Sequence, residues 1–256
     1  MPHLLILGGT SEARELGERL AGRADLVVTI SLAGRTARPA AQAVAVRVGG
    51  FGGAAGLATY LRVQRIDALI DATHPFAVTI SAHAAEATAG AFIPLLALRR
   101  PPWQPVAGDR WLNVADRDAA VAATGDTPRR IFLALGRQDL APFERAPHHD
   151  YLVRSVDPVV PPLRLARATY VCARGPFGEA DDRALLSAHR IDAVVAKNSG
   201  GAATYSKIAA ARSLGLEVIM IARPAAPPVP TVETVAEAIA WLDHDHGLCG
   251  VKDRGV

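Results

Sequence analysis

The sequence predicts an α/β protein made of two doubly wound, Rossmann-like domains with mainly parallel sheets and a cleft between them. Short aliphatic runs of strand length alternate with segments of helical periodicity along most of the 256 residues. Several of these runs end directly in glycine, as βα turns do. Because the alternation comes in two series, we expect domains over residues 1–100 and 129–256, with a linker over 101–128.

Composition limits the class of partner. Half of the residues are hydrophobic but only 5% are aromatic, so the core is expected to be aliphatic. The net charge of +3 is spread along the chain without a Lys/Arg run, which argues against a nucleic-acid partner. Cys172 and Cys249 stand far apart, so we expect neither a thiol metal site nor a disulfide framework.

The sequence has no recognisable targeting segment and no apolar run of membrane-spanning length. These features predict a cytoplasmic protein without a membrane partner. The oligomeric state stays open, and a monomer is compatible with the sequence.

The first strand is expected at residues 4–7, where four apolar residues in a row indicate burial on both faces. A turn and a helix over 13–20 follow, and such a junction offers backbone N–H groups and a helix dipole to a phosphate. The turn residues given this role are Gly8, Gly9, Thr10, Ser11 and Glu12. The two glycines permit positive φ, and one of the two hydroxyl residues should cap the helix. The third glycine of the G-x-G-x-x-G pattern is missing, so an ordinary turn without a ligand is the alternative.

The next strand, expected at 26–31, ends in residues suited to a 2′-phosphate. Ser31 and Arg35 lie at or just beyond this strand end, and no acidic residue is present there. Because an acidic residue at this point favours NAD, its absence favours NADP. The alternative for Arg35 is a solvated loop cation.

A glycine-rich loop over 49–53 follows the third expected strand, 44–48. Its four glycines, which include Gly50 and Gly52, surround one aromatic residue, and a helix over 54–64 follows at once. We expect the loop backbone to pass close to a ligand, with a plain surface turn as the alternative.

Polar residues crowd the end of the fourth strand, expected at 66–71. Asp71, Thr73 and His74 lie where α/β sheets place their ligands, and we take Thr73 as a cofactor contact. Asp71 and His74 are candidate proton donors, and His74 could also bind a substrate carboxylate. The alternative is that Asp71 and Thr73 only hold the loop in place. Pro75 suits the first position of the next helix, expected over 77–89.

The fifth strand, 93–98, ends in Arg99 and its neighbouring arginine, which suit an anionic ligand. The second series then has the following expected elements: strands at 111–114, 131–135, 151–156, 169–174, 191–197 and 217–221, and helices at 117–123, 181–189, 205–214 and 232–242, with a helix start after Gly136. Lys197 ends a strand at a glycine loop, where Ser199, Gly200 and Gly201 let the backbone approach a ligand. An interdomain salt bridge is the competing explanation for Lys197.

Four stretches together resemble one family. They are Gly8-Gly9-Thr10-Ser11-Glu12-Ala13-Arg14, Gly49-Gly50-Phe51-Gly52, Asp71-Ala72-Thr73-His74-Pro75-Phe76-Ala77 and Lys197-Asn198-Ser199-Gly200-Gly201. In this order they resemble the precorrin-6A reductases of cobalamin biosynthesis, over nearly the whole chain. The resemblance implies NADPH as cofactor and reduction of a C=C bond of the macrocycle precorrin-6A to give precorrin-6B.

The resemblance also implies how the candidate residues are used. The first glycine turn would hold the NADPH pyrophosphate, and Ser31 and Arg35 its 2′-phosphate. The substrate is a tetrapyrrole with many carboxylates, which Arg99, Arg137, Lys197 and His74 could bind. The proton would come from Asp71, His74 or water.

Three other functions are weighed against this one. The first is the same reduction on a cobalt-loaded substrate, and the second is a non-catalytic NADP-binding sensor of the same fold. The third, a nucleotide-sugar or phosphate-transferring enzyme, is disfavoured because no acidic pair with Mg²⁺ spacing stands at a strand end.

Overall fold

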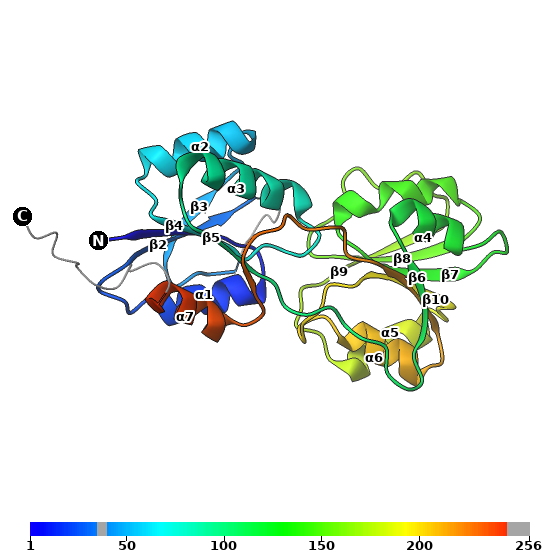
Figure 1. Cartoon of the computed structure of the whole chain (residues 1–256). Helices are drawn as coiled ribbons and strands as arrows, with labels where there is room; N and C mark the ends of the chain where they lie inside the picture. Colours follow the sequence, from blue (N-terminus) through cyan, green and yellow to red (C-terminus); the bar gives the residue numbers. More distant parts are fainter. Residues whose placement is uncertain (35–39, 245–256) are drawn as a thin grey trace, which may run out of the picture. The chain divides into compact units, whose positions relative to one another are not determined.

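The computed structural model describes residues 1–34 and 40–244, which divide into two compact units. Unit 1 comprises Met1–Pro101 together with the segment that begins at Ala225, and unit 2 comprises Pro102–Pro224. Each unit contains one parallel six-stranded sheet with helices on both faces, so the predicted Rossmann-like class is confirmed (Figure 1).

Unit 1 has its strands in the order β12-β5-β4-β1-β2-β3. The strands are β1 (His3–Leu7), β2 (Val27–Leu32), β3 (Ala45–Val48), β4 (Ala68–Asp71), β5 (Leu95–Leu98) and β12 (Thr231–Val232). The helices are α1 (Ser11–Leu20), α2 (Gly53–Val63), α3 (Val78–Ala91) and α7 (Val235–His244). Figure 1 shows α2 and α3 on one face of this sheet and α1 and α7 on the other.

The two faces explain why β1 is a continuous apolar run. Leu4 and Ile6 pack with residues of α1 and α7, whereas Leu5 and Leu7 pack with residues of α2 and α3. All four side chains are buried, and each contributes about 1.5–3 kcal/mol of hydrophobic free energy.

Unit 2 has the order β6-β11-β10-β7-β8-β9, which repeats five strands of unit 1 in the same chain order. The sixth differs, because the edge strand β6 comes first in the sequence of its unit, whereas β12 comes last in its own. The strands are β6 (Arg110–Val114), β7 (Arg130–Ala134), β8 (Asp150–Ser155), β9 (Ala168–Cys172), β10 (Ala193–Lys197) and β11 (Glu217–Ile221). The helices are α4 (Arg117–Ala123), α5 (Glu179–Ala188) and α6 (Ser206–Ser213), with two 3₁₀ turns η1 (Arg137–Asp139) and η2 (Ala141–Arg145).

The structure corrects the expected domain boundaries in two places. The segment expected as a linker contains β6 and α4, and β6 pairs with β11 at the edge of the second sheet. The last helix, α7, belongs to unit 1, because β12 pairs with β5 and α7 covers the α1 face of that sheet. Unit 1 is therefore built from two separate stretches of the chain.

Two expected helix starts are also wrong. The segment after Gly136 forms the short 3₁₀ turns η1 and η2 in place of an α-helix. Pro75 does not open α3, whose N-cap is Ala77, so neither Thr73 nor His74 caps that helix. No helix within residues 1–34 and 40–244 is long and apolar enough to cross a membrane.

Candidate active site

The carboxyl ends of β1 and β4 lie side by side in unit 1, at the point where the strand order reverses. Ligands of doubly wound sheets bind in the crevice at such a point. Thr10 joins the two strand ends, because its Oγ1 accepts from the N–H of Ala13 (3.1 Å) and donates to the carbonyl of Ala72 (2.7 Å). Thr10 is therefore the N-cap of α1, and its hydroxyl proton is used to shape the turn.

The two glycines of this turn have different functions. Gly9 has a φ of +115°, and a Cβ added there would meet no atom within 4 Å. Gly8 is not in the positive-φ region, and an added Cβ would lie 2.8 Å from Cγ2 of Ile30. Gly8 thus lets β2 pack closely, while Gly9 turns the backbone toward open space.

Gly17 was not singled out by the sequence reasoning, although a glycine inside a predicted helix is a usable signal. An added Cβ at Gly17 would lie 2.7 Å from Cδ1 of Ile30. Gly17 therefore supplies the close helix–strand packing for which dinucleotide-binding units use the third glycine of their fingerprint. Gly17 lies further along α1 than the third glycine of the G-x-G-x-x-G pattern would lie.

Asp71 ends β4 and is 3% exposed. Its Oδ1 accepts from the backbone N–H and the hydroxyl of Thr73 (3.1 and 2.6 Å). Its Oδ2 accepts from the hydroxyl of Ser81 (2.5 Å) and from Nη2 of Arg99 (3.3 Å). Four donors, one of them the guanidinium of Arg99, thus face one carboxylate, and both of its oxygens act as acceptors.

His74 lies in the loop between β4 and α3. Its Nδ1 accepts from the backbone N–H of Phe76 (3.2 Å), so the neutral ring carries its proton on Nε2. The imidazole stands 5.7 Å from the ring of Phe76, centroid to centroid. The loop geometry therefore selects one tautomer and orients one N–H donor.

Glu12 follows the turn and carries a charge that opposes an anion. Nη1 of Arg100 lies 2.6 Å from Oε2 of Glu12, and both side chains are largely buried. A narrow gap, without room for a water molecule, adjoins this pair, and it brings together side chains from the ends of β1, β4 and β5. It is lined by Thr10, Glu12, Thr73, Pro75, Leu98, Arg99 and Arg100.

Arg47 organises the ends of β2 and β3, and it was missed from the sequence. Its Nη1 donates to Oγ of the buried Ser31 (3.1 Å) and to the carbonyl of Gly49 (2.5 Å), and its Nη2 donates to the carbonyl of Gly50 (2.6 Å). The guanidinium also stacks 3.8 Å from the centroid of the Phe51 ring. Register explains this arrangement, because Ser31 and Arg47 are cross-strand partners.

The loop after β3 adopts the conformation that its glycines permit. Gly52 has a φ of +79° and forms the N-cap of α2, and Cβ atoms added at Gly50 or Gly52 would meet nothing within 4 Å. Arg35, the other expected 2′-phosphate contact, lies outside the described residues.

A second site lies at the corresponding reversal point of unit 2, between β7 and β10. Lys197 ends β10, and its Nζ contacts Oδ2 of Asp139 at 2.8 Å. Oδ1 of the same carboxylate contacts Nη1 of Arg117 at 2.6 Å. Burial acts to raise the pKa of Asp139, but Lys197 and Arg117 outweigh it, so this pKa is lowered. The salt bridge considered for Lys197 thus exists, but within unit 2.

The loop that follows Lys197 is held by residues from distant parts of unit 2. The side-chain amide of Asn198 accepts from the backbone N–H of Trp103 (2.7 Å) and donates to its carbonyl (3.0 Å). Arg223 donates to the carbonyls of Asn198 (2.8 Å) and Ser199 (2.9 Å). Gly200 and Gly201 both have positive φ, at +66° and +73°.

The expected site residues therefore form three groups. Around the first reversal point lie Gly8, Gly9, Thr10, Ser11, Glu12, Asp71, Thr73, His74 and Arg99. At the ends of β2 and β3 lie Ser31, Gly50 and Gly52. In unit 2, Lys197, Ser199, Gly200 and Gly201 share one loop, and Arg137 follows β7, with Nη1 3.2 Å from the carbonyl of Pro158.

Unit 1 fits a pyrophosphate-containing dinucleotide. The space beside the backbone is empty at Gly9 and Gly52, next to the N-termini of α1 and α2. These helix N-termini carry partial positive charge. A cation, Arg47, lies at the end of β3 beside Ser31, where a 2′-phosphate would meet β2.

The chain is similar to known proteins along nearly its whole length. The chain is 55% identical over 243 residues to a precorrin-6A reductase of Sinorhizobium sp, covering 95% of this chain and 93% of that protein. It is 50% identical to the precorrin-6A reductase of Rhodobacter capsulatus over the full length of both. A solved structure described as CobK precorrin-6A reductase superposes with a TM-score of 0.92 at 49% identity, covering 96% of this chain and 98% of that one.

Relatives named cobalt-precorrin-6A reductase are more distant, such as one from Priestia megaterium at 30% identity over 235 residues, covering 86% of this chain and 90% of that protein. The model of the family described as precorrin-6x reductase CbiJ/CobK matches residues 3–243. With that match and with relatives of this similarity along nearly its whole length, the chain belongs to the precorrin-6x reductase family.

Proposed function

We propose that this protein is an oxidoreductase of cobalamin biosynthesis that uses NADPH to reduce one C=C bond of precorrin-6A, giving precorrin-6B. The observation that carries the proposal is the open glycine turn at the reversal point of unit 1, in a chain of this family. When bound, NADPH supplies the hydride, so the protein contributes orientation, electrostatics and a proton.

Unit 1 is the proposed cofactor unit. Gly9 and the N-terminus of α1 bind the pyrophosphate, with Thr10 and Thr73 shaping the turn. Arg47 supports the 2′-phosphate together with Ser31 and Arg35, and it holds the Gly50–Gly52 loop against the cofactor. A guanidinium suits a phosphate because it donates two parallel hydrogen bonds.

The substrate carboxylates are proposed to meet unit 2. Lys197 and the loop 199–201 provide a cation and accessible backbone, and Arg137 provides a guanidinium that is 40% exposed. Arg99 differs, because it pairs with the buried Asp71. We therefore assign Arg99 to positioning Asp71 and not primarily to the substrate.

His74 is the proposed proton donor. As the donor, His74 must be the imidazolium, which releases the proton of Nε2 and leaves a neutral ring. Protonation of Nδ1 breaks the hydrogen bond that it accepts from the backbone N–H of Phe76. Asp71 accepts four hydrogen bonds, so every group that its two oxygens contact is a donor. A proton on either oxygen would point at one of these donors. Asp71 thus acts as a positioning residue for the Thr73–His74 loop, and water is the competing proton source.

The test of the function is oxidation of NADPH by the purified protein, followed through the NADPH absorbance band. Oxidation should require precorrin-6A and should be much slower with NADH. Equal rates with NADH would refute the 2′-phosphate assignment while leaving the reductase intact. Binding of NADPH without oxidation would favour the NADP-binding sensor, and oxidation only with cobalt-precorrin-6A would favour the reductase that acts on the cobalt-loaded substrate.

The proton donor has its own test. His74→Ala should lower kcat, change its pH profile and leave the Kd for NADPH within about twofold, because the ring does not shape the phosphate turn. Asp71→Asn should lower kcat without moving the pH profile. Unchanged turnover in both variants would assign the proton to water.

A further inference from the structure

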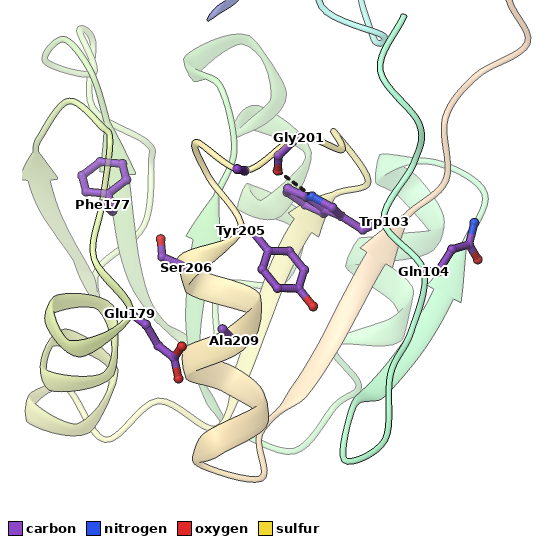
Figure 2. Close-up of a pocket in the computed structure, with 9 residues that line it drawn as sticks. Trp103, Gln104, Phe177, Glu179, Gly201, Tyr205, Ser206 and Ala209 are labelled. Atoms are coloured by element: carbon purple, nitrogen blue, oxygen red, sulfur yellow. Dashed lines mark hydrogen bonds between the residues drawn. The ribbon is translucent and has the colours of Figure 1, made fainter. Parts of the chain in front are cut away.

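Unit 2 contains a pocket that adjoins the proposed substrate loop at Gly201, and its other lining residues have no role in the proposed function. It has a volume of about 460 Å³ and is lined by Trp103, Gln104, Phe177, Glu179, Gly201, Ala202, Tyr205, Ser206 and Ala209 (Figure 2). Three of these are aromatic, in a chain with only 5% aromatic residues. Figure 2 shows Phe177 just before α5 and Glu179 at its start, opposite Tyr205, Ser206 and Ala209 at the N-terminal part of α6.

The aromatic wall formed by Trp103 is held in a fixed position. The backbone of Trp103 is bound on both sides by the amide of Asn198, and its Nε1–H donates to the carbonyl of Gly201 (2.8 Å). The rings of Trp103 and Tyr205 lie 5.6 Å apart at an angle of 60°. A rigid aromatic surface binds a flat ligand without a large loss of side-chain entropy.

Each aromatic wall also has a cation near its ring. Nζ of Lys207 lies 5.0 Å from the Trp103 ring centroid, and the guanidinium carbons of Arg154 and Arg212 lie 3.8 and 5.7 Å from the rings of Phe177 and Tyr205. These cations have internal partners.

Lys207 donates to the carbonyl of Thr204 (2.6 Å), Arg154 contacts Asp182, and Arg212 lies 3.4 Å from Oδ1 of Asp109. They therefore stay with the rings, where they draw electron density from them. An electron-poor aromatic surface favours stacking with an electron-rich π system.

We propose that this pocket binds one face of the tetrapyrrole macrocycle, a role that rests on the proposed function. Its volume accommodates one or two of the macrocycle's pyrrole-derived rings, in the range typical of small-molecule pockets. Glu179 is exposed at the start of α5, where its carboxylate accepts from a ring N–H and repels the substrate carboxylates. The carboxylates are thereby directed out of the pocket, which orients the macrocycle.

The first test fills the pocket without touching the core. Ala202 and Ala203 are adjacent and both exposed, but only Ala202 lines the pocket. Binding of precorrin-6A is measured directly by equilibrium ultrafiltration, using the absorbance of the substrate, and the Kd for NADPH is measured by fluorescence. Ala202→Trp should raise the Kd for precorrin-6A at least about tenfold, whereas Ala203→Trp should leave it within about twofold. Neither variant should change the Kd for NADPH.

A second pair of variants tests the aromatic contacts. Phe177→Leu should raise the Kd for precorrin-6A about three- to tenfold, the loss expected for one stacking partner. Phe92→Leu is the matched control, because Phe92 is 96% exposed in unit 1. Circular dichroism confirms that each variant is folded.

The outcomes separate the two proposals. If the unsubstituted protein oxidises NADPH with precorrin-6A but Ala202→Trp and Phe177→Leu bind the substrate as tightly as their controls, the pocket assignment is overturned. If the unsubstituted protein binds precorrin-6A but does not oxidise NADPH, the proposed function fails while the ultrafiltration series still decides the pocket. If precorrin-6A does not bind at all, both are overturned.

Discussion

Ile30 should decide whether an alanine at Gly17 stabilises or destabilises unit 1. Ile30 is fully buried in β2 and contacts the positions of two glycines. A Cβ at Gly17 would lie 2.7 Å from its Cδ1, and a Cβ at Gly8 would lie 2.8 Å from its Cγ2. The two substitutions therefore clash with different atoms of one side chain.

Two opposing terms determine the effect of Gly17→Ala. Alanine is favoured over glycine inside a helix by about 1 kcal/mol. Overpacking a close-packed core costs about 1–3 kcal/mol. The net result is a loss of up to about 2 kcal/mol in the free energy of unfolding of unit 1. In an Ile30→Val background Cδ1 is absent, so Gly17→Ala should instead raise this free energy by up to about 1 kcal/mol.

Gly8→Ala is the internal control, because valine retains the branch that corresponds to Cγ2. It should destabilise unit 1 in both backgrounds. The assay is amide hydrogen exchange of β1 and β2 across a urea titration, which reports on unit 1 without assuming that the two units unfold together. An equal loss for Gly17→Ala in both backgrounds would refute the reasoning, because Cδ1 would then not be the obstacle.

Three further predictions concern charges inside unit 2. Arg154→Met should lower the free energy of unfolding by about 3–5 kcal/mol in a urea titration, because it leaves the buried Asp182 unpaired; adding Asp182→Leu should recover part of the loss. Burial lowers the pKa of His149 below its ordinary 6.5, so the stability of unit 2 should fall as the pH drops below about 6.5, and His149→Gln should flatten this dependence in thermal melts. Lys197 and Arg117 hold the pKa of Asp139 below 3.8, so the ionised carboxylate should stabilise unit 2 at pH 4 and above, and this stabilisation should be lost in stronger acid. In acid titrations, Asp139→Asn should lack this loss of stability.

Elements with their own local signal were predictable from the sequence. The run Leu4–Leu7 reads as a buried strand because α1, α7, α2 and α3 cover both faces of its sheet. β12 has no such signal, since it is only two residues long and exists because it pairs with the edge of β5. β6 was recognisable as a strand, but the sheet to which it belongs was not, because its partner β11 lies about a hundred residues further along the chain.

The same distinction applies to the site. Strand-end positions such as Asp71, Thr73 and Lys197 follow from the fold class, because parallel strands present their carboxyl ends along one edge. Their partners depend on register and on side-chain rotamers, which a linear pattern does not encode. The contacts of Asp139 with Lys197 and of Arg47 with Ser31 therefore emerged only from the structure.

The split composition of unit 1 has a consequence for the order in which the molecule is made. A ribosome delivers all of Pro102–Pro224, which is unit 2, before it delivers β12 and α7. Until then the outer edge of β5 has no neighbour, and the apolar surface that Trp241 and Leu242 later cover is exposed to water. The backbone N–H of Arg99 donates to the carbonyl of Val232, so the arginine that pairs with Asp71 acquires this bond only after Val232 has been synthesised. Assembly of the candidate active site thus depends on a segment that is made after all of unit 2, and a nascent protein with a finished unit 2 has no finished cofactor unit.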